Sequence, residues 1–344
     1  MKNVILIIEE SLRYDYAMTA PIFQELPGIG LFFERMYASG TSTIVNLCSI
    51  RSGMYPPKHG WRKWPICNEF RYGEIKTLEQ FLAEAGYNIV SDLSYPWSPT
   101  TTQQLLINEE TFEQSIVKRP FFLYAHHNYF HDLIFPAVGP SHADHELYRE
   151  NVIQIDKYLR NVFALIESHG LKDYTLVVII ADHGIGLYGD GYKGIDRGDY
   201  GAGQIYDFRT RVPCAIIGPG IEPKVIKNAY SNVDLLPTIL DYCDIPLDYA
   251  PSHLKPQGIS AFSELDENRL VYMEAQSPNS VWPSYAPNVF GATDGKVKVM
   301  QTPDGDLCFD LLFDPKEQHH EPEIMSSDKG QEMLEFVERI KRSG

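Results

Sequence analysis

Cysteine is scarce in this chain, and no two cysteines stand in the CxxC spacing of a redox or zinc motif. The five thiols are odd in number and scattered along 344 residues, at Cys48, Cys67, Cys214, Cys243 and Cys308. Dispersed free thiols are typical of a reducing compartment. The N-terminal sequence MKNVILIIEE has a single Lys and only a short apolar run, which is not a signal-peptide pattern. We therefore expect a cytoplasmic protein.

Long hydrophobic runs and an excess of positive charge are also missing. No segment approaches the roughly 18 uninterrupted apolar residues of a membrane-spanning helix. The chain has 30 Lys and Arg residues against 46 Asp and Glu residues, a formal net charge of −16. Such an acidic balance disfavours binding to nucleic-acid phosphates and adhesion to anionic membranes. We expect neither kind of partner, and the sequence leaves the oligomeric state open.

The order of apolar segments predicts an α/β fold with a mainly parallel sheet sandwiched by helices. Runs rich in Val, Ile, Leu and Phe predict buried strands, and segments with helical periodicity fall between them. After about residue 262 the strands become shorter and a closing helix follows. We expect a catalytic domain over 1–262 and a small antiparallel α+β subdomain over 263–344. The predicted strands are 3–8, 31–33 with 36–37, 87–90, 120–125, 175–181, 212–217, 270–273, 297–300 and 307–311, and the predicted helices are 47–51, 78–85, 148–169, 233–243 and 331–340.

Polar side chains follow several predicted strands at the points where these strands end. Glu9 and Glu10 follow the first strand, Asp182 and His183 follow the strand over 175–181, and Thr43 stands in a polar loop before a helix. Ligands of open α/β sheets bind at the carboxyl ends of the strands. Carboxylates and an imidazole at one edge suit Zn²⁺ or Mn²⁺, and a hydroxyl at such an ion can act as a nucleophile. Helix capping and ordinary loop roles are the structural alternatives.

Motifs over nearly the whole chain resemble the sulfatase-like branch of the alkaline phosphatase superfamily. The resemblance implies an alkaline phosphatase-like fold and a metal-dependent hydrolase or transferase. It also implies a divalent metal ion, for which we expect Zn, with Mn, Mg and Ca as alternatives. The segments that carry the resemblance are 3–13, 52–60, 156, 170–184, 211–213, 218–221, 234–238 and 309–317.

The residue at the nucleophile position separates the branches of this family. Sulfatases place a Cys or Ser nine residues before the Thr of a Thr-Gly pair, and nine residues before Ser52 this chain has Thr43. Cys48 and Arg51 stand too close to Ser52 to form the sulfatase motif. The segment around Thr43 is similar to phosphoethanolamine transferases, lipoteichoic acid synthases and nucleotide pyrophosphatase/phosphodiesterases. The resemblance therefore implies phosphoryl transfer rather than a formylglycine sulfatase.

The same resemblance implies roles for individual residues. Glu10, Asp182 and His183 would hold the metal together with Thr43, and Glu9 is a further candidate ligand. Asn46 would stabilise the phosphoryl oxygens, and His131 would protonate the leaving oxygen or contact the phosphoryl group. His126 and His127 are expected to be structural.

We expect a hydrolase or phosphotransferase that forms a phospho-Thr intermediate on a small-molecule or glycan phosphoester, either a monoester or a diester. Two alternatives stay open. One is a sulfate-ester hydrolase, and the other is a catalytically inactive relative that acts as a binding module.

Overall fold

The computed structural model describes residues 2–62, 71, 73–90, 106–127, 145–187, 203–248, 254–264, 266–276 and 288–344. His131 and Cys67 lie outside the described residues. The other four cysteines are free thiols. No helix in these ranges is long and apolar enough to cross a membrane.

A seven-stranded sheet with β1 (Asn3–Glu9) near its middle forms the core. The strand order is β4-β5-β1-β6-β8-β2-β9. β1 pairs in parallel with β5 (Phe121–His127) on one side and with β6 (Thr175–Ala181) on the other. All seven residues of β1 and all seven of β6 are buried, as expected for strands covered on both faces. The remaining strands are β4 (Asn88–Val90), β8 (Cys214–Ile217), β2 (Leu31–Phe33) and β9 (Lys224–Ile226).

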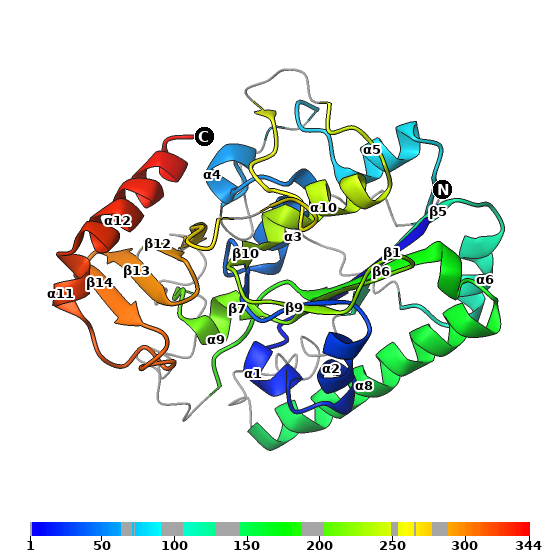
Figure 1. Cartoon of the computed structure of the whole chain (residues 1–344), viewed down its shortest axis with the longest axis horizontal. Helices are drawn as coiled ribbons and strands as arrows, with labels where there is room; N and C mark the ends of the chain where they lie inside the picture. Colours follow the sequence, from blue (N-terminus) through cyan, green and yellow to red (C-terminus); the bar gives the residue numbers. More distant parts are fainter. Residues whose placement is uncertain are drawn as a thin grey trace, which may run out of the picture.

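Helices cover both faces of this sheet, which confirms the predicted fold class (Figure 1). On one side lie α3 (Thr43–Ser52), α5 (Leu78–Glu84) and α10 (Leu235–Tyr242). On the other lie α1 (Tyr14–Ala17), α2 (Pro21–Glu25) and the long α8 (His145–Ser168). The shorter elements are α4 (Pro56–His59), α6 (Glu109–Ile116), α9 (Asp207–Thr210), η1 (Leu26–Gly28), η2 (Lys172–Tyr174) and η4 (Asn232–Asp234).

Two of the predicted strands are each divided between two sheets. β2 and β3 (Met36–Tyr37) separate where the chain turns at Glu34 and Arg35. β7 (Arg211–Val212) and β8 separate at Pro213, which has no backbone N–H to donate to a ladder. β3 and β7 then join β10 (Tyr230–Ser231) in a three-stranded sheet of order β10-β3-β7.

The C-terminal part is the antiparallel α+β unit that the sequence predicted. Its sheet runs β11 (Val271–Ala275), β12 (Val289–Thr293), β13 (Val297–Thr302) and β14 (Gly305–Asp310), all antiparallel. α11 (Pro322–Met325) and α12 (Asp328–Lys341) follow, and α12 packs along this sheet (Figure 1). We missed β12, because Gly291 interrupts its apolar pattern. A Cβ at Gly291 would lie 2.6 Å from the Val299 carbonyl oxygen on β13, so the close strand approach requires glycine. The boundary at residue 262 stays a prediction.

A fully buried ammonium group joins this C-terminal sheet to the rest of the molecule. The Nζ of Lys298 on β13 lies 2.5 Å from Asp207 on α9 and 2.9 Å from Glu317. Burial opposes charge on the lysine, but the two carboxylates outweigh it and raise the pKa of Lys298. Burial raises the pKa of Glu317, and Asp207 beside it adds to the rise. The three groups therefore depend on one another for charge compensation.

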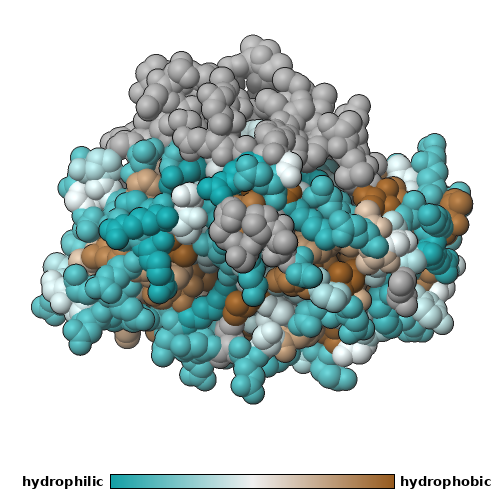
Figure 2. All heavy atoms as spheres, turned by 90° about the horizontal axis from the view of Figure 1, so that it is seen from above, coloured by the Kyte–Doolittle hydropathy of each residue, from teal (hydrophilic) through white to brown (hydrophobic). Residues whose placement is uncertain are grey.

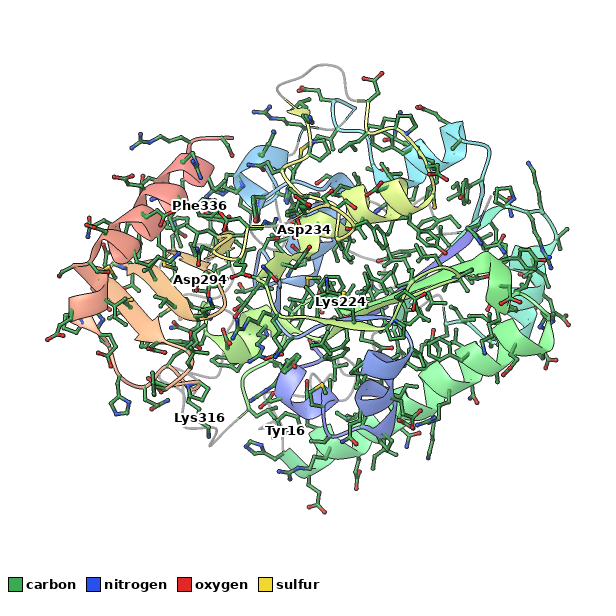
Figure 3. All side chains as sticks on the ribbon, in the orientation of Figure 1. Tyr16, Lys224, Asp234, Asp294, Lys316 and Phe336 are labelled. Atoms are coloured by element: carbon green, nitrogen blue, oxygen red, sulfur yellow. The ribbon has the colours of Figure 1, made fainter. Side chains whose placement is uncertain are left out.

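Polar residues dominate the described surface seen in Figure 2, where brown apolar residues are separated by teal ones. A second ion pair lies on the C-terminal part at Asp294, which is labelled in Figure 3. Its carboxylate is 3.4 Å from Nζ of Lys329. The Lys329 side chain is 29% exposed. The Asp294 side chain is 5% exposed, but its Oδ1 also accepts the N–H groups of Lys296 at 2.8 Å and Val297 at 2.9 Å, so it depends less on a partly exposed cation.

The substitution Lys298→Met should destabilise the protein by about 3–5 kcal/mol, because it leaves two buried carboxylates without a cation. Lys329→Met is the matched control and should cost about 1 kcal/mol or less. Urea unfolding of both variants at pH 7.5 measures the difference. Equal effects of the two substitutions would show that the buried cluster does not join the two parts.

Candidate functional site

The candidate site lies at the carboxyl edge of the sheet, where β1 and β6 end side by side. Glu9 pairs with Ala181 in the parallel register of these strands. Glu10 and Asp182 directly follow, and both are buried, with 3% and 0% exposure. His183 comes next and is 4% exposed. Parallel pairing therefore places two carboxylates and an imidazole at one point of the edge.

Thr43 reaches this point from the opposite direction, as the first residue of α3. Its Oγ1 lies 3.2 Å from Nε2 of His183 and 3.5 Å from Oε1 of Glu10. The Ser42 side chain does not cap this helix, so it leaves the first N–H groups of the helix available. Thr43 is half-buried, whereas the acidic groups behind it are buried. The structure thus brings together four of the predicted site residues.

The tautomer of His183 follows from its backbone contact. Nδ1 lies 2.8 Å from the carbonyl oxygen of Gly184. A carbonyl can only accept, so Nδ1 carries the proton in the neutral ring and Nε2 is the nitrogen with the lone pair. This lone pair faces Thr43 and lies 3.3 Å from Oδ2 of Asp182. A ring held in this way can accept a proton or bind a metal ion through Nε2.

Asp182 is fixed by two backbone donors. Its Oδ1 accepts hydrogen bonds from the N–H of Ser11 at 2.8 Å and of His183 at 2.7 Å. Ser11 adopts a φ of 61°, an uncommon left-handed conformation for a residue with a side chain. The turn after β1 thus directs its N–H toward Asp182. Oδ2 stays unbonded within the described structure.

Unpaired polar atoms gather around this carboxylate. Oε2 of Glu10, Oδ2 of Asp182 and Nε2 of His126 are all buried and lack a hydrogen-bond partner among the described residues. His126 and Glu10 lie 3.3 Å apart. Burial raises the pKa of Asp182, and the Glu10 carboxylate adds to the rise. Burial alone would lower the pKa of His126, but the larger combined effect of Glu10, Asp182 and Glu9 raises it.

These atoms fit a bound cation in chemical type. Buried polar groups are normally hydrogen-bonded, so the unbonded carboxylate oxygens of Glu10 and Asp182 are suited to a positively charged partner. Within the described ranges, however, no group of three or more His, Cys, Asp or Glu side chains has the arrangement of a ready-made metal site. Binding at Glu10, Asp182 and His183 thus requires these side chains to move closer or further ligands to join them.

Glu9 takes a separate place from Glu10. Its Oε2 lies 2.6 Å from Nδ1 of His127, which also packs on the ring of Tyr158 at a centroid distance of 4.5 Å. Successive residues of a strand point to opposite faces, so Glu9 and Glu10 diverge where β1 ends. We expected Glu9 to be a further metal ligand. The structure places its carboxylate beside His127, while its backbone oxygen accepts the Asp182 N–H at 3.3 Å, so the role of Glu9 as a ligand stays a prediction.

Asn46 is fully buried, and its amide is saturated. Its oxygen accepts hydrogen bonds from Gly40 N–H and Asn232 Nδ2, both at 2.9 Å. Its Nδ2 donates to the carbonyl oxygens of Gly40 at 2.9 Å and Ser42 at 3.1 Å. An amide with four such bonds has no capacity left for a substrate. In this structure Asn46 holds the loop before Thr43, and its expected contact with substrate oxygens, which would require one of these bonds to break, stays a prediction.

A buried series of hydrogen-bonded side chains supports the same loop from the protein interior. Ser39 donates to Ser49 at 2.8 Å, and Ser49 contacts Nε2 of His59 at 3.0 Å. The Trp61 N–H donates to Nδ1 of His59 at 3.0 Å, so the proton of the neutral ring lies on Nε2. Burial lowers the pKa of His59 to about 3, and Arg62 contributes. His59 is thus a neutral part of the scaffold.

Comparison with known proteins adds the family. The model of the sulfatase family matches residues 90–245. Human arylsulfatase A is 27% identical over 212 residues, which cover 57% of this chain and 39% of that protein. The low-salt glycan biosynthesis sulfotransferase Agl7 of Haloferax volcanii is 25% identical over 306 residues, covering 84% of this chain and 69% of that protein. A solved 2-O GAG sulfatase superposes with a TM-score of 0.72 at 18% identity, over 99% of this chain and 92% of that one.

Residues 90–245 match the sulfatase family, and the whole chain has the fold of solved sulfatases and of a solved protein in the alkaline phosphatase superfamily. These matches agree with the predicted resemblance to the sulfatase-like branch. Sulfatases of this family use a divalent metal ion. The chain spans less than two thirds of the length of several curated relatives, 22% of bovine arylsulfatase K among them.

The predicted phosphoester chemistry and phosphoester substrate are wrong for this sulfatase-like chain. Most of its relatives and structural neighbours are named sulfatases, and one neighbour was solved with a glucosamine disulfate substrate. The wrong prediction followed from inferring phosphoryl transfer from a threonine at the nucleophile position. Phosphate and sulfate esters are both tetrahedral oxyanions that a hydroxyl attacks in line, so a hydroxyl nucleophile does not distinguish them.

Two features of the site were missed in the sequence. His126 was expected to be structural, although it is the last residue but one of β5 and lies beside Glu10. Its position at the end of a predicted strand was the available signal. Arg209 was not singled out, because the groups that it binds are backbone carbonyls of Thr41 and Gly184, which carry no sequence signal.

The stability of this sulfatase-like protein should fall as the pH drops below about 6.5, in part through His59. The unfolded state binds a proton near pH 6.5 and the folded state only near pH 3, so stability is full above the unfolded pKa and declines toward the folded one. Between pH 7.5 and 5.5 this group alone should remove about 1.4 kcal/mol.

Urea unfolding of wild type and His59→Gln at the two pH values measures this contribution. His59→Gln should have the smaller pH dependence, while His319→Gln, at an 81% exposed side chain, should match wild type. An unchanged pH dependence in His59→Gln would contradict the assignment of a buried neutral imidazole.

Proposed function

We propose that this chain hydrolyses sulfate esters and that Thr43 is the nucleophile. The observation that carries the proposal is the position of the Thr43 hydroxyl. Thr43 is the first residue of α3, which the Ser42 side chain does not cap. Its Oγ1 lies 3.2 Å from Nε2 of His183. The names of the relatives support sulfate as the group that is attacked.

Thr43 can lose its proton to groups that are already in place. The hydroxyl faces two acceptors, Nε2 of His183 and Oε1 of Glu10. As the proton leaves, Oγ1 forms a bond to sulfur and the bond from sulfur to the ester oxygen breaks. The leaving oxygen takes a proton and departs as an alcohol, and His131 is our proposed donor. Water then attacks the sulfur of the sulfated Thr43, releases sulfate and restores the hydroxyl.

The start of α3 supplies part of the stabilisation of the sulfate oxygens. Free N–H groups and the positive end of a helix favour an anion, and the Ser42 side chain does not compete for these N–H groups here. Asn46 contributes by fixing the loop that leads into the helix. Donors held in this way need little reorganisation when negative charge develops.

Glu10, Asp182 and His183 are the residues that we propose to hold a divalent metal. A metal ion bound there would act as a Lewis acid toward the sulfate oxygens and offset the local negative charge. The donor set contains an imidazole nitrogen, with His126 available beside Glu10. Nitrogen ligands suit Zn²⁺ and Mn²⁺ better than Ca²⁺, which takes oxygen ligands. We therefore propose Zn²⁺.

Transfer of the sulfuryl group to an acceptor hydroxyl is a second candidate function. It is favoured by the relative that covers 84% of the chain, which is named a sulfotransferase. The two reactions share the sulfated Thr43 and differ only in whether water or an alcohol attacks it. Released inorganic sulfate indicates hydrolysis, and a sulfated acceptor indicates transfer.

The substitution Thr43→Ala should abolish turnover of sulfate esters, a fall of about 10³-fold or more, because no nucleophilic oxygen remains. Thr43→Ser keeps the hydroxyl and should retain measurable activity. The assay compares wild type and both variants on nitrophenyl sulfate, phosphate and phosphodiester, with sulfate preferred. A Thr43→Ala variant with wild-type kcat would contradict the nucleophile assignment, and a wild type that prefers phosphate would contradict the proposed substrate class.

The protein should bind about one equivalent of Zn²⁺, and Asp182→Ala should weaken binding at least about ten-fold by removing a ligand. Glu84→Gln, at a 67% exposed side chain, is the control and should leave the affinity unchanged. Titration calorimetry on chelator-treated protein measures these affinities, and restoration of sulfate-ester turnover by Zn²⁺ is the second readout. Equal affinities of wild type and Asp182→Ala would contradict the proposed ligand set.

A further inference from the structure

A single guanidinium group connects the two loops that carry the candidate nucleophile and its acceptor. Arg209 lies on α9 and is 6% exposed. Its Nε donates to the Thr41 carbonyl oxygen at 3.1 Å, and Nη2 donates to the same oxygen. Nη1 donates to the Gly184 carbonyl oxygen at 2.7 Å. Thr41 lies two residues before Thr43, and Gly184 directly follows His183.

The contact with Gly184 runs in both directions. The Gly184 N–H donates to the backbone oxygen of Arg209 at 2.8 Å, while the Arg209 side chain donates to the Gly184 oxygen. That oxygen also accepts from Nδ1 of His183 at 2.8 Å, the contact that fixes the tautomer of the ring. A Cβ at Gly184 would lie 2.0 Å from the Phe208 carbonyl oxygen, so α9 packs directly against this loop. Arg209 therefore acts on the orientation of His183.

α9 is itself anchored from outside the site. The Asp207 N–H donates to Glu317 Oε2 at 2.6 Å, and the Asp207 carboxylate pairs with the buried Lys298. At the other end of α9, the Thr210 oxygen accepts from Ala38 N–H at 2.7 Å. The guanidinium of Arg209 thus extends from a short helix that is held at both ends. The Arg209 guanidinium can therefore hold the carbonyl oxygens of Thr41 and Gly184 at fixed positions.

We infer that Arg209 is a positioning residue that sets the separation between Thr43 Oγ1 and His183 Nε2. The role of Arg209 in catalysis rests on the proposed function, whereas its contacts with the two loops are observed in the structure. A planar guanidinium can serve two carbonyl oxygens at once from fixed directions. A lysine has a single nitrogen centre and cannot bridge the same two oxygens from this backbone position in the same geometry.

Arg211 offers a matched control two residues further on. Its Nε and Nη2 donate to one backbone oxygen, that of Glu34, at 3.0 and 2.7 Å. Its guanidinium also lies over the ring of Tyr14 at 4.0 Å. These contacts are of the same kind as those of Arg209, but the groups that they hold are not those of the candidate site.

The test compares Arg209→Lys with Arg211→Lys in the full chain. Arg209→Lys should lower kcat on nitrophenyl sulfate about 10- to 100-fold with KM within about three-fold, because small misplacements of reacting groups slow chemistry more than binding. Arg211→Lys should keep kcat within about two-fold. A kcat for Arg209→Lys within two-fold of wild type would overturn the inference.

Two further measurements, guanidinium rescue of kcat and Zn²⁺ affinity, distinguish a loss of positioning from a loss of folding. The Zn²⁺ measurement also tests the inference separately from the proposed function. Guanidinium ion added to Arg209→Ala should restore part of kcat, whereas the same ion should not raise the kcat of Arg211→Ala. Zn²⁺ affinity should fall for Arg209→Lys but not for Arg211→Lys, because His183 loses its support. If wild type turns over no sulfate ester, the proposed function fails while the Zn²⁺ comparison still tests the inference. Equal Zn²⁺ affinities in the two lysine variants would then refute it.

Discussion

The burial of two carboxylates where β1 and β6 end is the constraint on which the site depends. Glu10 and Asp182 lie almost fully out of solvent, and each has an oxygen without a hydrogen-bond partner in the described structure. Ionised groups in such surroundings are costly unless a positive charge compensates them. Burial raises the pKa of Asp182, with Glu10 adding to the rise, and the neighbouring carboxylates raise the pKa of His126 against the effect of burial. This concentration of buried negative charge is the basis of the proposed metal site, although the overall net charge of −16 does not by itself reveal it.

The other polar groups around the site mainly hold the loops that carry Thr43 and His183 in place. Asn46 saturates its amide within the loop that leads to Thr43, and Ser39, Ser49 and His59 support that loop from the interior. Arg209 joins this loop to the one that carries His183. Such arrangements allow the reacting hydroxyl and its acceptor to be aligned before a substrate binds. The C-terminal sheet takes part through Lys298, which holds the helix that carries Arg209.

The sequence predicted those features that follow from strand order. Buried strands and their polar ends were visible, and parallel pairing of β1 with β6 then brought Glu10 close to Asp182 and His183 as expected. It did not predict features that depend on contacts between distant segments. Glu9 pairs with His127 because adjacent strand residues diverge, and Asn46 is saturated by a loop that folds back on it. The phosphoester prediction was wrong because Thr43 defines how an ester is attacked but not whether its centre is phosphorus or sulfur.

The most direct test of this account is rapid-quench mass spectrometry of the peptide that contains Thr43. Wild-type protein is loaded with Zn²⁺, mixed with a nitrophenyl sulfate, quenched in acid within the first turnover and digested. The account predicts a peptide heavier by one SO₃ group, with the modification on Thr43. Rapid release of nitrophenol with an unmodified Thr43 peptide at every quench time would contradict it.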